Sequence, residues 1–322
     1  MTLLAGDVGG TKTALALYDG SKVVRREVLP SARFGSLEAL VREFLGPRHQ
    51  IERACFGVAG PVSQDACRAT NLPWVIEARG LEKDLGIPKV GLVNDFYALS
   101  IGLRELPESD FAALNSARPD PRGPWVVIGA GTGLGQAVLL KTADGFEVLA
   151  SEGGHTDFGP RNELEIDLLR FLMLRFGHVS YERIVSGPGL LNIYEFLLER
   201  AVAREPATVR EAIAGSPELA PAIISSRALE EPESLCAQAL DLFVEIFGAE
   251  AGNLALKVVA RGGVYVAGGI APKILPKLLD GTFMKAFLDK GRLGHVLEAT
   301  PVRVVLNAEA GLVGAAAIAR RL

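Results

Sequence analysis

The chain has 322 residues, enough for two domains with separate cores, and 34 Lys and Arg against 38 Asp and Glu give a net charge of −4. The lack of a basic excess argues against nucleic-acid binding, and a hydrophobic content of 49% argues against a disordered chain. Gly makes up 36 of the 322 residues, which indicates many tight turns or backbone that approaches a ligand closely.

The three cysteines, Cys55, Cys67 and Cys236, form no CxxC pair and are odd in number. We therefore expect neither a disulfide framework nor a structural zinc site. Asp7 interrupts the N-terminal apolar stretch, which argues against a signal peptide. The uncharged run 123–140 contains glycines and a proline, which argues against a membrane span. The sequence predicts a cytoplasmic protein that binds neither membrane nor nucleic acid.

Short apolar runs alternate with segments of helical periodicity in the first third of the chain, which predicts an α/β domain. Residues 3–5 and 14–18 flank a glycine-rich turn and predict a β-hairpin. Further strands are expected at 53–58 and 90–93, and helices at 38–45, 81–85 and 96–103.

Residues 107–124 are rich in Pro, Ser, Asn and Asp and predict a domain boundary or hinge. Beyond them, residues 125–140 repeat the strand–turn–strand pattern of the N-terminus. Aligning Gly6 with Gly129 sets 3–17 against 126–140, which suggests a duplicated architecture. In the second domain, helices are expected at 163–176, 189–204, 234–259 and 309–322, and strands at 262–270 and 301–306.

In each half of the chain, one glycine-rich loop follows the first strand. Residues 6–13 (GDVGGTKT) nearly form a P-loop, but Thr11 replaces the glycine that should precede Lys12, and a strand follows where a helix is required. Residues 129–135 (GAGTGLG) likewise fail the dinucleotide-binding pattern. The alternative is a pair of tight hairpins. Together with Gly268 and Gly269, the loops favour phosphate binding by backbone N–H groups.

Polar residues lie in two further places. Asn94 and Asp95 follow a buried strand and precede a helix, where α/β sheets bind ligands, although either residue could instead cap the helix. A carboxylate there could act as general base. Glu152 and His155 lie in a glycine-flanked loop without a nearby Cys or second His, which favours hydrogen bonding to a polyhydroxylated ligand over metal binding. Glu182, taken alone, would be a solvated carboxylate.

Taken in order, these motifs resemble the bacterial glucokinase family, within the sugar kinase, Hsp70 and actin fold group. The motifs are GDVGGTKT at 6–13, GVAGPV at 57–62, TNLPW at 70–74, LVNDFYA at 92–98, GAGTGLG at 129–135, SEGGHTDFGP at 151–160, ERIVSGPGL at 182–190 and AGGIAP at 267–272. The Cys-rich zinc motif of the related repressor/kinase subgroup is absent, so the sequence resembles the non-zinc branch.

The resemblance implies an α/β fold of two ribonuclease H-like domains that flank an interdomain cleft, the actin-like ATPase/sugar kinase fold. The small domain would comprise residues 1–108 plus 308–322, and the large domain 109–307. The implied activity is the ATP-dependent phosphorylation of D-glucose to glucose 6-phosphate. The resemblance leaves the oligomeric state open, a homodimer included.

The resemblance also assigns roles to residues. Glucose would be bound by several buried hydrogen-bonding groups, with Asp95 as general base; these groups are Asn94, Asp95, Glu152, His155 and Glu182. The ATP phosphates would face two loops, formed by Gly6, Asp7, Val8, Gly9, Gly10 and Thr11 and by Gly131, Thr132 and Gly133. Gly268 and Gly269 would line the adenosine side, and Asp7 would lie near Mg²⁺. Many members carry Asn-Ala at the positions of Lys12 and Thr13, so Lys12 receives no role.

Two alternatives differ from this assignment. A kinase of the same fold could act on mannose or fructose, or could use a polyphosphate donor. A catalytically silent sugar-binding regulator is a second alternative, against which Asp95 and both phosphate loops argue.

Overall fold

The computed structural model describes residues 1–20, 22–47, 50–69, 72–143, 145–200 and 207–322. The described residues divide into two compact units. Unit 1 comprises Met1–Asp110, Val148–Ala150 and Asn307–Leu322, and unit 2 comprises Phe111–Glu147 and Ser151–Leu306. Thr70 and Asn71 of the TNLPW motif, and the last four residues of the helix expected at 189–204, lie outside the described residues.

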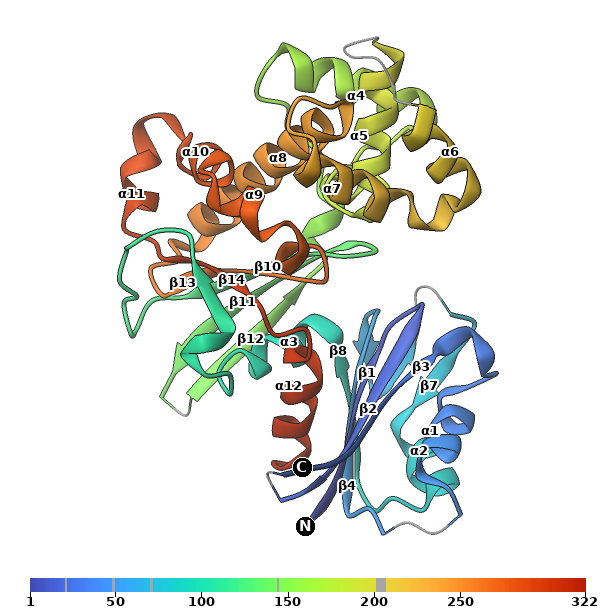
Figure 1. The fold of residues 1–322 in the computed structure, drawn as a ribbon. Coiled ribbons are helices and arrows are strands. Elements are labelled where there is room, and N and C mark those ends of the chain that lie inside the picture. The colour runs from blue at the N-terminus through green and yellow to red at the C-terminus, as the bar shows by residue number, and fades with distance from the viewer. Residues whose placement is uncertain (21, 48–49, 70–71, 144, 201–206) are drawn as a thin grey trace. The chain divides into compact units, whose positions relative to one another are not determined.

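Within the described part of unit 1, a five-stranded sheet has the strand order β3-β2-β1-β4-β8 (Figure 1). Its strands are β1 (Thr2–Val8), β2 (Lys12–Asp19), β3 (Lys22–Pro30), β4 (Arg53–Val58) and β8 (Val90–Asn94). The predicted hairpin is confirmed, because β1 and β2 are antiparallel. β1, β4 and β8 are parallel, and Val8, Val58 and Asn94 end them in register. The loops that follow these strands therefore share one edge of the sheet, where α/β proteins bind ligands.

Helices cover both faces of this sheet (Figure 1). One face packs on α1 (Leu37–Leu45) and α2 (Ala78–Leu85), and the other on α12 (Ala310–Ala319), which also crosses α3 (Asp95–Gly102). The crossing requires glycine, because a Cβ atom on Gly314 would lie 1.7 Å from the carbonyl oxygen of Ala98. A small antiparallel sheet completes the unit, formed by β5 (Val62–Ser63), β6 (Ala66–Arg68) and β7 (Val75–Glu77).

The larger sheet belongs to unit 2 apart from Val148–Ala150 of β12, and its six described strands follow the order β12-β11-β10-β13-β14-β9. They are β9 (Phe111–Ala113), β10 (Trp125–Ala130), β11 (Leu134–Thr142), β12 (Gly145–Ser151), β13 (Gly263–Ala267) and β14 (Val302–Val305). β10 is antiparallel to β11 and parallel to β13, which repeats the pairing of β1 with β2 and β4.

Two sequence expectations need correction. The offset of 123 residues relates the first strands of the two hairpins but not the second strands. Gly6 pairs with Leu15, whereas Gly129 pairs with Gly135, because the second hairpin is tighter. The segment 107–124 also contains a strand, β9, which pairs antiparallel with β14. Its short apolar run is extended because β14 offers it a sheet edge, and no local pattern predicts that partner.

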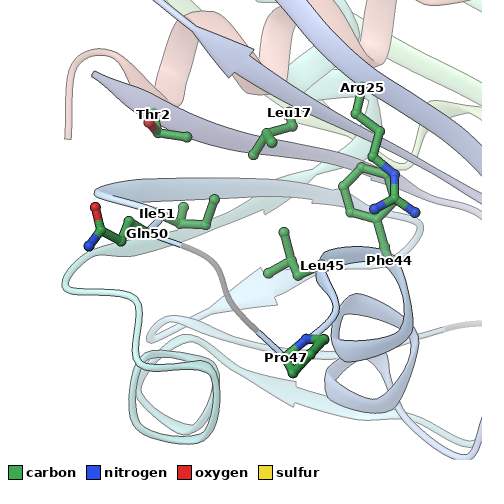
Figure 2. Close-up of a pocket in the computed structure, with 8 residues that line it drawn as sticks. All are labelled: Thr2, Leu17, Arg25, Phe44, Leu45, Pro47, Gln50 and Ile51. Atoms are coloured by element: carbon green, nitrogen blue, oxygen red, sulfur yellow. The ribbon is translucent and has the colours of Figure 1, made fainter.

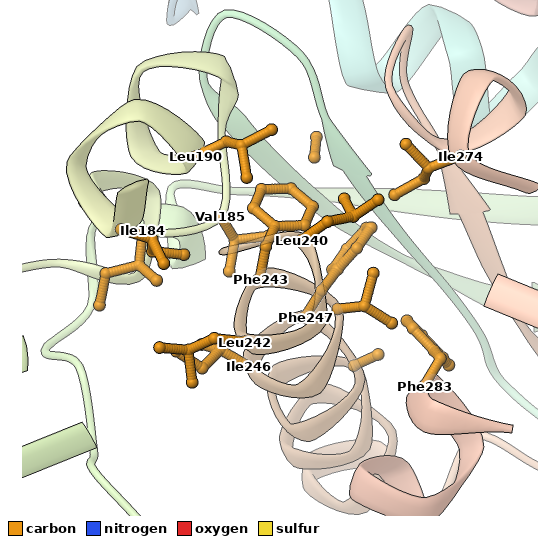
Figure 3. Packing of buried hydrophobic residues seen from close by; sticks show 14 of the residues in the cluster. Ile184, Val185, Leu190, Leu240, Leu242, Phe243, Ile246, Phe247, Ile274 and Phe283 are labelled. Carbon is orange, nitrogen blue, oxygen red and sulfur yellow. The ribbon is translucent and has the colours of Figure 1, made fainter. Parts of the chain in front are cut away.

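Helices α5, α7, α9, α10 and α11 of unit 2 pack against α8, a helix of 24 residues that is apolar on nearly every side. Figure 3 shows Phe243 and Phe247 of α8 among side chains from neighbouring segments, including Leu190 and Phe283. The helices are α4 (Glu163–Phe176), α5 (Gly187–Glu199), α6 (Ala207–Gly215), α7 (Ala220–Glu230), α8 (Leu235–Val258), α9 (Leu275–Leu279), α10 (Thr282–Leu288) and α11 (Gly294–Glu298). None of the helices in the described ranges combines the length and apolarity that crossing a bilayer requires.

Short 3₁₀ turns connect these elements in both units. They are η1 (Ser31–Arg33), η2 (Glu108–Asp110), η3 (Gly153–His155), η4 (Tyr181–Arg183), η5 (Pro217–Leu219), η6 (Ala271–Ile274) and η7 (Gly291–Leu293).

Candidate active site

Ser31 holds the first glycine loop, residues 9–11 of unit 1, through hydrogen bonds that we call the Ser31 brace. The hydroxyl of Ser31 donates to the carbonyl of Gly9 at 2.8 Å and lies 3.0 Å from the hydroxyl of Thr13, while its backbone N–H donates to the carbonyl of Thr11 at 3.1 Å. Ser31 and Thr13 are both fully buried. Sequence reasoning missed Ser31, which belongs to none of the motifs.

Asp7 lies on β1 directly before this loop. Its carboxylate has no hydrogen bond or ion pair to any residue in the described ranges, and burial raises the pKa of Asp7 to about 6. A Cβ atom on Gly311 would lie 3.0 Å from Oδ2 of Asp7, so the glycine leaves room beside the carboxylate. A partly buried carboxylate without a protein partner fits a hard divalent cation such as Mg²⁺ in both charge and donor type.

Asn94 is the N-cap of α3. Its Oδ1 accepts hydrogen bonds from the backbone N–H groups of Phe96 at 2.9 Å and Tyr97 at 3.2 Å. Its Nδ2 donates to the carbonyl of Gly60, in the GVAGPV motif, at 3.2 Å. The capping role expected as an alternative therefore holds for Asn94, and only its side-chain amide retains an N–H for a further acceptor.

Asp95 is the first residue of α3 and is partly buried at the carboxyl edge of the sheet. Its Oδ1 accepts from the N–H of Phe96 at 2.9 Å, and its charge contributes, after burial itself, to the raised pKa of Cys67. The N-terminus of a helix favours a negative charge at this position. The fold thus holds a carboxylate at the edge where β1, β4 and β8 end.

Unit 2 brings Glu182 and His155 together. Oε1 of Glu182 lies 3.9 Å from Nδ1 of His155, and Oε2 accepts a hydrogen bond from the N–H of Leu134 at 3.0 Å. A Cβ atom on Gly133 would lie 2.4 Å from that Oε2 atom, so glycine is required there. Glu182 is therefore no solvated surface carboxylate: its side chain is 29% exposed and is tied to the second glycine loop.

Glu152 and His155 are exposed, and the His155 side chain retains 61% of its accessible surface. The expectation that the sugar ligands are buried is therefore wrong for these two residues. The backbone beside them is nevertheless fixed, because a Cβ atom on Gly154 would lie only 1.9 Å from the carbonyl oxygen of Leu134. The loop is thus pressed against β11 while its polar side chains project outward. Across the described residues, no three His, Cys, Asp or Glu side chains are grouped as a metal site would need.

The second glycine loop meets two other segments of unit 2. The N–H of Gly187, at the start of α5, donates to the carbonyl of Gly131 at 2.8 Å, and the N–H of Ile270 donates to that of Ala130 at 3.2 Å. Gly268 has a positive φ of 85°, and a Cβ atom there would lie 2.3 Å from the carbonyl oxygen of Ala130. Residues 131–133 and 268–269 therefore adjoin at the carboxyl ends of β10 and β13.

A cavity of about 760 Å³ lies elsewhere in unit 1 (Figure 2). It is lined by Thr2, Leu17, Arg25, Phe44, Leu45, Pro47, Gln50 and Ile51. Thr2 begins β1 and Ile51 precedes β4, so the cavity borders the amino ends of the parallel strands, opposite the edge that α/β sheets use for ligands. None of the expected site residues lines it, and we do not assign it to the reaction.

A family model described as glucokinase matches residues 4–322. The chain belongs to the glucokinase family. Glucokinase of Nostoc punctiforme is 43% identical over 338 residues, covering 99% of each chain, and glucokinase of Chromobacterium violaceum is 39% identical, covering 98% of this chain and 88% of the relative. A crystal structure of a glucokinase from an Antarctic psychrotroph is 30% identical, with a TM-score of 0.81 and coverage of 100% and 99% of the two chains.

A glucokinase of the ROK family from Streptomyces griseus, solved in complex with glucose and AMPPNP, covers 100% of both chains with a TM-score of 0.69. At 21% identity it supports the fold alone. The full-length glucokinase matches confirm three predictions from the sequence. These are the resemblance to the glucokinase family, the sugar kinase fold class, and the ATP-dependent phosphorylation of glucose.

Proposed function

We propose that Asp95 is the general base of this glucokinase-family enzyme and accepts the proton of the glucose 6-hydroxyl as that oxygen attacks the terminal phosphoryl group of ATP. The observation that supports this role is the placement of Asp95 at the N-terminus of α3, on the carboxyl edge of the sheet. Phosphoryl transfer depends mostly on positioning and electrostatic stabilisation, and a positioned carboxylate supplies the proton acceptor that the alcohol requires.

Five residues are proposed to bind glucose. Asn94 and Asp95 belong to unit 1, and Glu152, His155 and Glu182 belong to unit 2. The carboxylates accept hydrogen bonds from sugar hydroxyls, the remaining N–H of Asn94 donates one, and the imidazole of His155 can do either. An epimer of glucose would leave some of these groups without partners, which disfavours its use.

Backbone N–H groups of the two glycine loops are proposed to bind the ATP phosphates. The sequence motifs assign Gly6, Asp7, Val8, Gly9, Gly10 and Thr11 in unit 1, and Gly131, Thr132 and Gly133 in unit 2, with Gly268 and Gly269 bordering the adenosine. Gly6, Asp7 and Val8 lie in β1 between β2 and β4, and the N–H groups of Gly9 and Gly131 donate within their own loops. The donors proposed for phosphate are therefore the N–H groups of Gly10, Thr11, Thr132 and Gly133. The Ser31 brace and the contact of Gly268 with Ala130 support preformed loops. Preformed donors stabilise developing charge without reorganisation during the reaction.

Mg²⁺ bound with the nucleotide is proposed as the cofactor, and Asp7 as the residue that would hold it. When bound, Mg²⁺ neutralises charge on the phosphates. The role of Asp7 is to present an unpaired carboxylate beside the first loop, with the space left by Gly311. The domain limits, the cytoplasmic location and a homodimer stay predictions.

The decisive experiment measures ADP release as a function of glucose and ATP, with the phosphorylated carbon identified by NMR. We expect turnover that depends on both substrates and yields glucose 6-phosphate. Faster turnover of mannose or fructose, or with polyphosphate as donor, would replace the substrate assignment. Glucose binding without ADP release would support the silent regulator.

A further inference from the structure

The core of unit 2 contains a chain of polar side chains that the proposed function does not use. Gln136 of β11 and Glu250 of α8 are each only 1% exposed, and Nε2 of Gln136 donates to Oε1 of Glu250 at 2.8 Å. Nδ2 of Asn253, one turn further along α8, donates to Oε2 of Glu250 at 3.0 Å and to the hydroxyl of Tyr181 at 3.1 Å. Both carboxylate oxygens of Glu250 are therefore engaged by side-chain amides.

One end of this chain lies against the loop that carries Glu152 and His155. A Cβ atom on Gly153 would lie 2.2 Å from Oε1 of Gln136, so the side-chain amide of Gln136 directly supports the backbone of the loop. A larger residue at 153, or a displaced amide at 136, would move the segment that presents the two polar side chains.

The other end lies at the residue before Glu182. Tyr181 is buried, its hydroxyl receives the amide of Asn253, and burial, with a contribution from the charge of Glu250, raises the pKa of Tyr181 to about 12. The N–H of Tyr181 donates to the carbonyl of Thr156 at 3.1 Å, which joins η4 to the loop that contains η3. Glu250 thus supports both segments that carry the proposed sugar ligands of unit 2.

A carboxylate in this position is costly to bury, and apolar side chains would fill the space between α8 and β11 at least as well for stability alone. Its presence is explained if it fixes geometry, because a network with every member satisfied specifies one arrangement. We propose that Glu250, acting through Gln136 on one side and through Asn253 and Tyr181 on the other, is a positioning residue for glucose binding. This inference rests on the proposed sugar-binding role of Glu152, His155 and Glu182.

The test compares Glu250→Gln with a matched control, Glu245→Gln, on the same helix. Glu245 is a half-buried carboxylate whose pKa is raised chiefly by burial, and it is hydrogen-bonded to neither sugar-ligand segment in the described structure. We expect Glu250→Gln to raise KM for glucose about tenfold or more, since small displacements of ligands weaken binding strongly, while KM for ATP changes less than about twofold. Glu245→Gln should leave both KM values unchanged.

A double variant provides the rescue. Glu250→Gln with Gln136→Glu exchanges the amide and the carboxylate, so an amide N–H again faces a carboxylate oxygen and Asn253 retains an acceptor. Its KM for glucose should return to within about threefold of the wild-type value. If Glu250→Gln gives no cooperative thermal transition, Tyr181→Phe, which removes only the hydroxyl, reports instead with a rise of about threefold or more in KM for glucose.

A folded Glu250→Gln variant with wild-type KM for glucose, or with KM raised equally for glucose and ATP, would overturn the inference. Glu182→Gln separates this failure from failure of the proposed function. If Glu182→Gln raises KM for glucose and Glu250→Gln does not, only the positioning role is wrong. If Glu182→Gln also leaves it unchanged, the sugar-site assignment itself fails.

Discussion

At the scale of single residues, the sequence alone does not decide which of Asn94 and Asp95 caps the helix and which is available as a general base. Asn94 uses its Oδ1 atom to cap α3, and the N–H of Phe96 is shared between that oxygen and Oδ1 of Asp95, each at 2.9 Å. Because Asn94 already supplies the cap, Asp95 is not required for it. The motif indicates that both residues matter, and the geometry shows what the first of them does.

Replacement of Asp95 by Asn therefore tests chemistry rather than folding. The cap remains, so the melting temperature should change little, whereas the amide is unable to accept the proton of the attacking hydroxyl. We expect kcat to fall by about 10²–10⁴-fold, the usual contribution of a general base, with a much smaller change in glucose affinity. The measurements are kcat, glucose titration and thermal unfolding of one variant. Retention of more than about a tenth of wild-type kcat by the folded protein would show that another group accepts the proton.

Asp7 gives a second prediction, on pH. Its pKa is raised from 3.8 to about 6, so the protonated form is favoured by folding, and the associated stability is complete below pH 3.8 and lost as pH rises through about 6. Asp7→Asn removes the buried charge. Without nucleotide or Mg²⁺, the variant should be more stable than wild type at pH 8 and equally stable near pH 4. The upper bound on the difference in unfolding free energy at pH 8 is about 3 kcal/mol, and solvent screening of the partly exposed carboxylate makes the difference smaller.

Urea unfolding of both proteins across this pH range measures the effect. A stability difference that does not change with pH would mean that Asp7 does not titrate as its burial implies. The same variant should lose turnover at limiting Mg²⁺ with ATP and glucose in excess, because an amide oxygen binds the cation more weakly than a carboxylate. A gain in stability together with a loss of activity is the pattern expected of a carboxylate whose burial destabilises the fold but whose charge is needed for function.

At the scale of elements, the sequence predicts what is local and misses what depends on partners. The bounds of β4 and α4 agree with the structure residue for residue, because periodicity and flanking turn residues specify them. β3 and β9 were not predicted: Val and Arg mix in β3 without a clear period, and β9 forms only because β14 lies beside it. The same distinction holds for the site, where Glu250 lies 114 residues from Gln136 and no local pattern connects them.

Ser31 is such a partner, and it tests whether the first glycine loop is held in shape. Ser31→Ala removes the hydroxyl that bonds to the carbonyl of Gly9 and leaves the buried hydroxyl of Thr13 without this contact. We expect a loss of roughly 1–3 kcal/mol in stability and a rise in KM for ATP, with KM for glucose nearly unchanged. The control is Ser31→Thr, which retains a hydroxyl. An unchanged KM for ATP in a destabilised Ser31→Ala variant would restrict the brace to a structural role.

At the scale of the whole molecule, the two units are not consecutive stretches of the chain. Unit 1 is discontinuous, since α12 comes from residues 307–322 and buries Leu312, Ala315 and Ala316 against the sheet face that carries Leu3 and Cys55. A last helix that is apolar on all sides indicates burial, but it does not identify the sheet that buries it. That pairing depends on contacts between residues far apart in the sequence, such as the hydrogen bond that the guanidinium of Arg53 donates to the carbonyl of Arg320, 267 residues away.

The discontinuity leads to a prediction about which pieces fold. Apart from the short segment Val148–Ala150, unit 1 ends at Asp110 and resumes at Asn307, and Nδ2 of Asn307 donates to Oδ2 of Asp110 at 2.7 Å. A short Gly/Ser linker of about four residues can therefore join residues 1–110 to 307–322 without strain. Because α12 then covers its sheet face, this linked polypeptide should unfold cooperatively in urea, whereas residues 1–110 alone should expose that face and lack a cooperative transition.

Circular dichroism and urea titration of the two polypeptides distinguish the outcomes. A matched control places Asp in the buried face of α12 with Ala315→Asp in the linked polypeptide, where an unpaired buried charge should abolish the transition. Cooperative unfolding of residues 1–110 alone would show that α12 is dispensable for the core of unit 1. Absence of a transition in the linked polypeptide would show instead that unit 1 needs the rest of the chain, and the division at Asp110 and Asn307 would then describe contacts but not an independent folding unit.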